Sequence, residues 1–210
     1  MIDSQQFENI KQKHGRYASW AVWADAAENP KSNMGDMSIF VLDSNPRLLH
    51  VLKTNVIMVG LNIASFSRLL LEAFRNFHDP HPSANDFKIR YAFRDTEYYG
   101  AYMTDIVKGE ETTNSKDLHA RLKANPALVE QNIEHFREEL RDLNCTAPTI
   151  LAFGVVAYSI VHDNLGSGEY SRLIKLTHYS HYISKEKYRE KVLSQIARHE
   201  MAAPVMFPLS

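Results

Sequence analysis

The chain has 210 residues, of which 44% are hydrophobic and 23% charged, and its formal net charge is −1. These values are typical of one globular domain, and the near-neutral charge argues against a general nucleic-acid binder, which usually carries a basic excess. The single cysteine, Cys145, excludes an internal disulfide, a cysteine-rich zinc site and a four-cysteine iron–sulfur cluster. The chain has no apolar stretch of transmembrane length and no apolar signal-peptide core at its start, so we expect a cytoplasmic protein.

We expect a single domain over residues 1–210, in which residues 1–50 form a mostly helical N-terminal extension. Apolar residues at near-helical spacing predict a helix in residues 4–24, with a break at Gly15. A short apolar run predicts a strand at residues 37–42. A helix is predicted at residues 44–53, with Ser44 as its cap.

From residue 56 onward, short apolar runs alternate with helical patterns. The runs at residues 56–60, 100–107, 148–154 and 171–180 predict four strands. Helices are predicted at residues 67–77, 84–95, 115–124, 125–143, 155–166 and 184–200. Continuous apolar strands separated by helices indicate a parallel sheet that is covered on both faces. We therefore predict an α/β fold, a three-layer α/β/α sandwich with a central, mainly parallel four-stranded sheet.

Polar residues follow the predicted strands at their carboxyl ends, which read GLNIAS, TDIVKG, FGVVA and THYSHY. In open α/β sheets, ligands bind outside these ends. Asn62, in GLNIAS, therefore stands where an α/β enzyme keeps its chemistry. An asparagine after a strand is also a common cap of the next helix, and this alternative stays open.

Histidines near these strand ends allow a second interpretation. His178 and His181 lie three residues apart, and the segment FHDPHP contains His78, Asp79 and His81. Imidazole and carboxylate groups are zinc ligands, so a metal-dependent hydrolase is one alternative. Solvated loop histidines are the other.

Taken together, these segments resemble the uracil-DNA glycosylase superfamily, especially its mismatch-specific and single-strand-selective branches. GLNIAS resembles the Gly-x-Asn-Pro-Gly motif, and FHDPHPSANDFK is similar to a segment with phenylalanine before His-Pro-Ala-Asn-x-Phe. YMTDIVKG and PTILAFGVVAY resemble two strands of the family, and LTHYSHY resembles its closing His-Pro-Ser motif. The similarity runs in order from Val56 to Tyr188.

Four positions depart from the family pattern. Ile63 and Ala64 replace Pro-Gly, and Tyr179 replaces the proline of His-Pro-Ser. Asp105 stands where single-strand-selective enzymes carry a base-reading asparagine. These departures bear on activity and base preference more than on the fold.

The resemblance implies a metal-free, monofunctional DNA glycosylase that hydrolyses the N-glycosidic bond of uracil or another altered base in base excision repair. It implies no cofactor, a monomer without membrane association, and single- or double-stranded DNA with an extruded base as partner. Asn62 would orient the attacking water. His178, as a neutral donor, would stabilise O2 of the leaving base.

The resemblance also implies a base pocket made by Gly60, Phe77 and Asp105, in which Phe77 stacks on the base. Periodicity alone allows Phe77 to be ordinary helix core, and Asp105 to be a cap of the turn before Gly109. An ionised aspartate only accepts hydrogen bonds, so a charged Asp105 would favour bases that offer donors over uracil.

For contact with the DNA strand, the resemblance places a wedge after the closing motif, at Tyr182 or Ile183. Lys185 and Lys108 are candidates for phosphate contacts. The alternative for the region around Lys185 is an ordinary solvated helix face. For the whole protein, the rival is a catalytically inactive nucleobase- or nucleotide-binding protein on the same fold, favoured by the near-neutral charge and the motif departures.

Overall fold

The computed structural model describes residues 2–63, 72–110, 112 and 114–202. Within them, one sheet contains five strands in the order β1-β3-β2-β4-β5. The strands are β1 (Ala18–Trp20), β2 (Lys53–Asn62), β3 (Ala101–Val107), β4 (Thr149–Phe153) and β5 (Arg172–Leu176). The four predicted strands are β2 to β5, and every pairing among them is parallel. The fifth strand, β1, lies at the edge of the sheet and runs antiparallel to β3.

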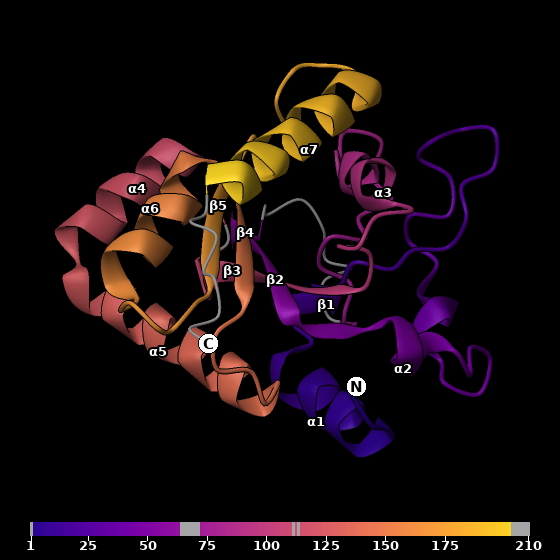
Figure 1. The fold of residues 1–210 in the computed structure, drawn as a ribbon, viewed down its shortest axis with the longest axis horizontal. Helices are drawn as coiled ribbons and strands as arrows, with labels where there is room; N and C mark the ends of the chain where they lie inside the picture. Colours follow the sequence, from indigo (N-terminus) through magenta and orange to yellow (C-terminus); the bar gives the residue numbers. More distant parts are fainter. Residues whose placement is uncertain (1, 64–71, 111, 113, 203–210) are drawn as a thin grey trace, which may run out of the picture.

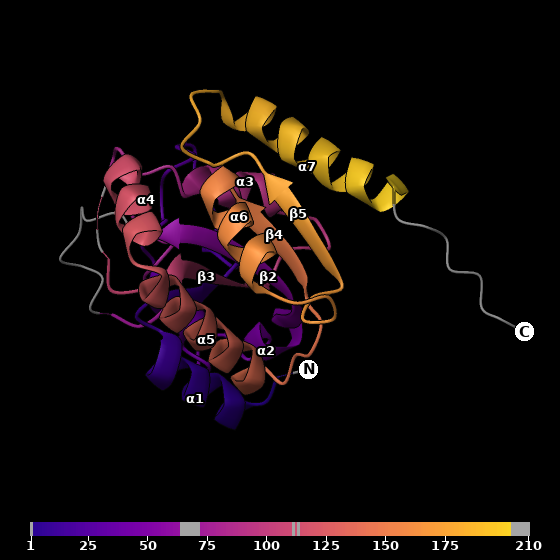
Figure 2. The same ribbon diagram turned by 90° about the vertical axis from the view of Figure 1, so that its left-hand side faces the viewer.

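Helices cover both faces of the sheet, which confirms the predicted three-layer α/β/α arrangement (Figures 1 and 2). One face carries α4, α5 and α6, with α1 packed against α5, whereas α3 and α7 cover the other face. The helices are α1 (Ser4–His14), α2 (Leu48–Val51), α3 (Phe87–Phe93), α4 (Ser115–Ala124), α5 (Pro126–Asp142), α6 (Val155–Asn164) and α7 (Lys185–Ala202). A 3₁₀ helix, η1, spans Met37–Phe40.

The central strands are apolar on both faces because each face is buried. Ile57 and Val59 of β2 belong to the hydrophobic cluster that includes Phe136 of α5. Met58, between them, belongs to the opposite cluster, which includes Tyr188 of α7. Successive strand residues point to opposite faces, so a strand between two helix layers requires a continuous apolar run.

The N-terminal prediction was wrong in three segments. Residues 18–20 form β1 instead of continuing the helix, although the predicted break at Gly15, directly after α1, is confirmed. Residues 37–40 form η1 instead of a strand. The helix predicted over residues 44–53 is reduced to four residues with Arg47, not Ser44, at its N-cap. Pairing of Ala18 with Thr104 across the sheet edge overrides the local helical periodicity.

The first 50 residues are also not an extension added to a finished domain. Phe7, Trp20 and Phe40 are at most 3% exposed and belong to the main hydrophobic cluster. Nε2 of His14 lies 2.7 Å from Oδ2 of Asp142 and ties the end of α1 to the end of α5. The sheet and the core are therefore incomplete without this segment.

The segment before α3 also differs from its prediction. Ala64 and residues 67–71 of the helix predicted at 67–77 lie outside the described residues, and residues 72–77 form turns. Phe74 and Phe77 have φ of 66° and 65°, which an α-helix does not allow. Phe77 is therefore not part of a helix core.

Downstream, local signals placed the helices well. Helix α4 has the predicted bounds, and α5 begins at Pro126 after Asn125, whose Oδ1 accepts a hydrogen bond from the Leu128 N–H at 3.3 Å. Oγ of Ser184 accepts from the Lys187 N–H at 3.3 Å at the start of α7, as predicted for a cap. In the part of the chain that the structure describes, no helix combines the length and apolar character needed to cross a membrane.

Candidate functional site

A cavity of about 510 Å³ lies at the carboxyl ends of β2, β4 and β5. Asn62, Phe77 and His178 all line it, although they come from three distant parts of the sequence. Phe153 and Tyr179 add aromatic surface, and further polar lining residues are Asn76, Asp79 and Asp86. The parallel strands thus bring three of the predicted site residues to one place, which is called the strand-end cavity below.

Asn62 is the last residue of β2 and is half-buried at the edge of this cavity. Its Nδ2 donates to the carbonyl oxygens of Ile63 at 3.0 Å, Glu110 at 3.0 Å and Thr112 at 2.9 Å. The amide nitrogen therefore holds the segment after β3 against β2. Among the described residues, Oδ1 has no partner, so this atom is the candidate to accept a hydrogen bond from a ligand or water. The capped helix of the alternative interpretation lies outside the described residues.

His178 follows β5 and has a defined tautomer. Its Nδ1 accepts a hydrogen bond from the Ser180 backbone N–H at 3.1 Å and lies 2.8 Å from Ser180 Oγ. A backbone N–H can only donate, so Nδ1 carries no proton and the neutral ring carries it on Nε2. Burial lowers the pKa of His178 to about 4, and the ring stacks on Tyr179 with centroids 4.3 Å apart. At neutral pH this residue is a neutral Nε2–H donor.

Phe77 is held in a left-handed conformation that is rare for a large side chain. Its N–H donates to Oδ1 of Asn76 at 3.1 Å, and its carbonyl accepts from Nε1 of Trp23 at 3.1 Å. Strain of this kind persists where neighbours over-determine the backbone, and it is concentrated at ligand sites. The ring is 3% exposed and forms a fixed wall of the strand-end cavity.

Gly60 brings the Phe77 ring and Asp105 together. A Cβ built at Gly60 would collide with Oδ1 of Asp105 and would lie 3.2 Å from the Phe77 ring. Only a glycine allows this approach. The three residues predicted to form a base pocket are therefore neighbours, with Asp105 behind Gly60 and Phe77 and outside the lining of the cavity.

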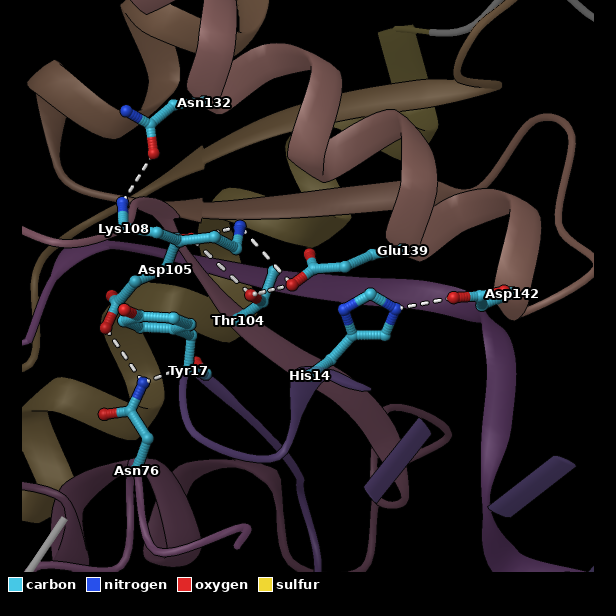
Figure 3. Close-up of polar contacts among 9 residues, drawn as sticks. All are labelled: His14, Tyr17, Asn76, Thr104, Asp105, Lys108, Asn132, Glu139 and Asp142. Atoms are coloured by element: carbon cyan, nitrogen blue, oxygen red, sulfur yellow. Dashed lines mark hydrogen bonds and ion pairs between the residues drawn. The ribbon is translucent and has the colours of Figure 1, made fainter. Parts of the chain in front are cut away.

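Asp105 lies on β3 and is 2% exposed. Figure 3 shows its carboxyl directed at Asn76, whose Nδ2 donates to Asp105 Oδ2 at 2.9 Å and to the Tyr17 carbonyl at 2.7 Å. Burial raises the pKa of Asp105 to about 7, against the hydrogen bond from Asn76 and the charge of Lys108. The side chain does not cap the turn before Gly109, so that alternative is wrong.

Asp86 is a cavity residue that the sequence analysis missed. It stands directly before α3 without capping it, is 8% exposed, and accepts a hydrogen bond from the Asp79 N–H at 3.0 Å on Oδ2. Burial raises its pKa to about 7. Asp86 falls in the first turn of the helix predicted at residues 84–95, where acidic residues are common, so only the placement of its side chain distinguishes it.

Lys108 was predicted to contact phosphate, and the structure contradicts this. Its side chain is 8% exposed, and Nζ lies 3.3 Å from Oε1 of the fully buried Glu139. Nζ also donates to the Asp105 carbonyl at 2.9 Å (Figure 3). The cation therefore compensates a buried charge beneath the sheet.

The loop between β5 and α7 carries the other predicted DNA contacts. Tyr182 is fully exposed on this loop, two residues beyond the cavity-lining Ser180, as expected for a wedge. Ile183 instead packs against the hydrophobic cluster beneath α7. Nζ of Lys185 pairs with Glu186 and lies 4.7 Å from the centre of the Tyr91 ring, so it is already engaged.

The histidines of the proposed metal site do not gather. His78 is completely buried between the rings of Trp23 and Phe40, with centroids 5.4 and 5.3 Å away, and burial lowers its pKa to about 3. Among the described residues, no three His, Cys, Asp or Glu side chains are grouped so as to hold a metal ion. The metal-dependent hydrolase therefore has no support in this part of the chain.

Comparison of the chain with protein-family models, with curated proteins and with solved structures found no match in any of the three. The geometry of the strand-end cavity is therefore the basis on which a function is inferred.

Proposed function

We propose that this protein is a monofunctional DNA glycosylase-like hydrolase, which removes uracil or another altered base from DNA in base excision repair. The observation that carries the proposal is the convergence of Asn62, Phe77 and His178 on one cavity at the carboxyl ends of the parallel strands. A volume of about 510 Å³ is ample for an extruded base with part of its sugar.

In the proposed reaction, a water attacks C1′ of the sugar, the C1′–N bond breaks, and its electron pair leaves with the base. The proton that the water loses passes through solvent to the departing base anion. Positive charge develops on the sugar, so a weak but well-placed nucleophile suffices. Asn62 Oδ1 accepts a hydrogen bond from that water. His178 Nε2–H donates to the base oxygen on which negative charge develops, and a neutral donor fixed in advance is suited to this task.

A catalytically inactive nucleobase-binding protein is the second candidate. The observation in its favour is the engagement of Asn62 Nδ2 by three backbone carbonyls, which gives this side chain a structural role without catalysis. The same cavity and the same stacking wall at Phe77 would serve binding alone.

The test is incubation with end-labelled oligonucleotides that contain uracil, hypoxanthine, xanthine or mismatched thymine, followed by alkaline cleavage at abasic sites. We expect cleavage of at least one of them, in the presence of a chelator as well as in its absence. His178→Ala should lower the rate on the order of a hundredfold or more, because one donor to the developing anion is lost.

His81→Ala is the matched control. Nδ1 of His81 accepts from the Ser83 N–H at 3.2 Å, as that of His178 does from Ser180, but His81 does not line the cavity. This variant should retain the parental rate. An equal loss in both variants, or full activity in His178→Ala, would contradict the proposed role; base binding without any excision would favour the binding protein.

A further inference from the structure

We infer that the strand-end cavity selects a nucleobase with an exocyclic amino group, and that Asp86 is the residue that recognises this group. The inference rests on the proposed function in one respect, because it assumes that a base enters this cavity. The substrate class is damaged bases that resemble cytosine or adenine and keep their amino group. Uracil has no such group.

The first step is the position of Asp86. The side chain is more than nine-tenths buried, yet it lines the cavity. Within the described residues its carboxyl takes part in one hydrogen bond, from the Asp79 N–H to Oδ2. Oδ1 accepts none and remains accessible, so it is an acceptor that a ligand in the cavity can reach. A ligand that enters the cavity displaces solvent from this atom, so the ligand must donate a hydrogen bond to it or leave the acceptor unpaired at a cost.

The second step is the balance of charge around the cavity. Asp79, another carboxylate, lines the same wall as Asp86. Arg75 is the cationic residue among the described residues of the lining, but its Nη1 donates to the Gly35 carbonyl at 2.6 Å and its Nη2 pairs with Glu72 at 2.8 Å. The cavity therefore presents acceptors and negative charge at this wall, and the lining residues that the structure describes supply no free cation to balance them.

The third step is the chemistry of the bases. Uracil presents an oxygen acceptor at position 4, whereas cytosine presents an amino donor there. An ionised carboxylate only accepts hydrogen bonds, so it pairs with the amino group and repels the oxygen. Asp86 therefore discriminates against uracil-like bases, because its carboxylate would face a second acceptor at position 4. The cost corresponds to about one to two decades in rate or affinity.

The closing experiment compares two lesions that differ at position 4 of the ring and in the proton on N3, 5-hydroxycytosine and 5-hydroxyuracil, in otherwise identical oligonucleotides. Assays at about pH 8.5 keep the Asp86 carboxyl ionised. The parent protein should excise the cytosine derivative about tenfold or more faster. Asp86→Asn supplies a donor as well as an acceptor in the same shape, so this preference should disappear or reverse.

Asp43→Asn is the matched control, because it makes the same chemical change at an exposed position, and it should keep the parental preference. Calorimetric titration of each protein with free cytosine and free uracil separates the inference from the proposed function. If no oligonucleotide is cleaved but cytosine binds at least tenfold more tightly than uracil, and only Asp86→Asn loses this difference, the glycosylase proposal fails and the inference stands.

Three results would overturn the inference. The first is that the parent protein excises the two lesions at equal rates and binds the two free bases with equal affinity. The second is a preference that Asp86→Asn leaves unchanged. The third is the absence of both excision and binding for either ring type.

Discussion

Glu139 and Asp105 are buried acids in two different environments (Figure 3). Asp105 is a residue of β3, and its neighbour Thr104 on the same strand contacts Glu139. Thr104 donates to Glu139 Oε1 at 3.0 Å on the α5 side, where Lys108 supplies a cation at 3.3 Å. Asp105 points to the opposite face, where its carboxyl is hydrogen-bonded by Asn76. Successive strand residues face opposite sides, so one strand supplies both environments.

The difference shows which acid is structural and which is a candidate for function. Glu139 is fully buried but paired with a cation, so its charge is compensated within the fold. Asp105 and Asp86 lie near the strand-end cavity, and burial raises the pKa of each to about 7. Carboxyls with perturbed pKa values beside a cavity are typical of functional sites, whereas compensated pairs are typical of the core.

Removing the cation on the structural side should give the largest effect. Lys108→Met leaves Glu139 buried without its partner, which should lower the free energy of unfolding by about 3–5 kcal/mol. Chemical denaturation followed by circular dichroism measures this change.

Lys116→Met, at an exposed position of α4, is the control and should change stability little. Adding Glu139→Leu to Lys108→Met should recover much of the loss, since the uncompensated charge is then gone. A stable single variant would mean that water reaches Glu139 and that the two acids do not differ as described.

Asp105→Asn should give an intermediate effect on the cavity side, with a defined pH dependence. The folded-state pKa of Asp105 lies above its ordinary value of 3.8, so the folded protein binds this proton more tightly. Its contribution to stability is complete below about pH 4 and is lost as the pH rises through about 7. The variant should therefore lose stability less steeply over this range, measured by denaturation at several pH values.

The same variant tests how Asp105 acts on the base. Asp105 lies behind Gly60 and Phe77 and outside the cavity lining, so it acts on the cavity through the lining residue Asn76; Asp105→Asn should therefore remove the pH dependence of uracil excision around pH 7. The charges of Asp86, Glu139 and Lys108 also act on Asp105, so the pH profiles of stability and rate must be fitted with these groups included. Unchanged stability and unchanged rate across the pH range would exclude Asp105 from both roles.

Tyr182→Ala should give the smallest effect on stability, because this side chain is fully exposed and belongs to neither buried region. We expect a change within about 0.5 kcal/mol. Excision from duplex DNA should fall more than excision from single strands, since a wedge is needed only where a base must leave a stack. Tyr182→Phe keeps the ring and should retain the duplex rate; equal losses on both substrates would argue against a wedge.

Much of the fold was readable from the sequence where local signals were sufficient. The apolar run at residues 56–60 identified β2, and Asn125 with Pro126 identified the start of α5. The rule that ligands bind beyond the carboxyl ends of parallel strands also groups Asn62 and His178, and both line the strand-end cavity. These predictions depend on periodicity and on residues near each other in the chain.

The tertiary structure alone decided the features that depend on distant partners. Strand β1 exists because Ala18 pairs with Thr104, and this long-range pairing outweighs the helical pattern around it. Lys108 is internal because Glu139, 31 positions further along the chain, lies beneath it. Asp86 falls in the first turn of the helix predicted at residues 84–95, and only the tertiary structure places its carboxyl at the cavity. The charge and hydrogen-bonding capacity of a side chain follow from its residue type. Its burial determines the energetic consequence of both, and burial depends on the tertiary structure.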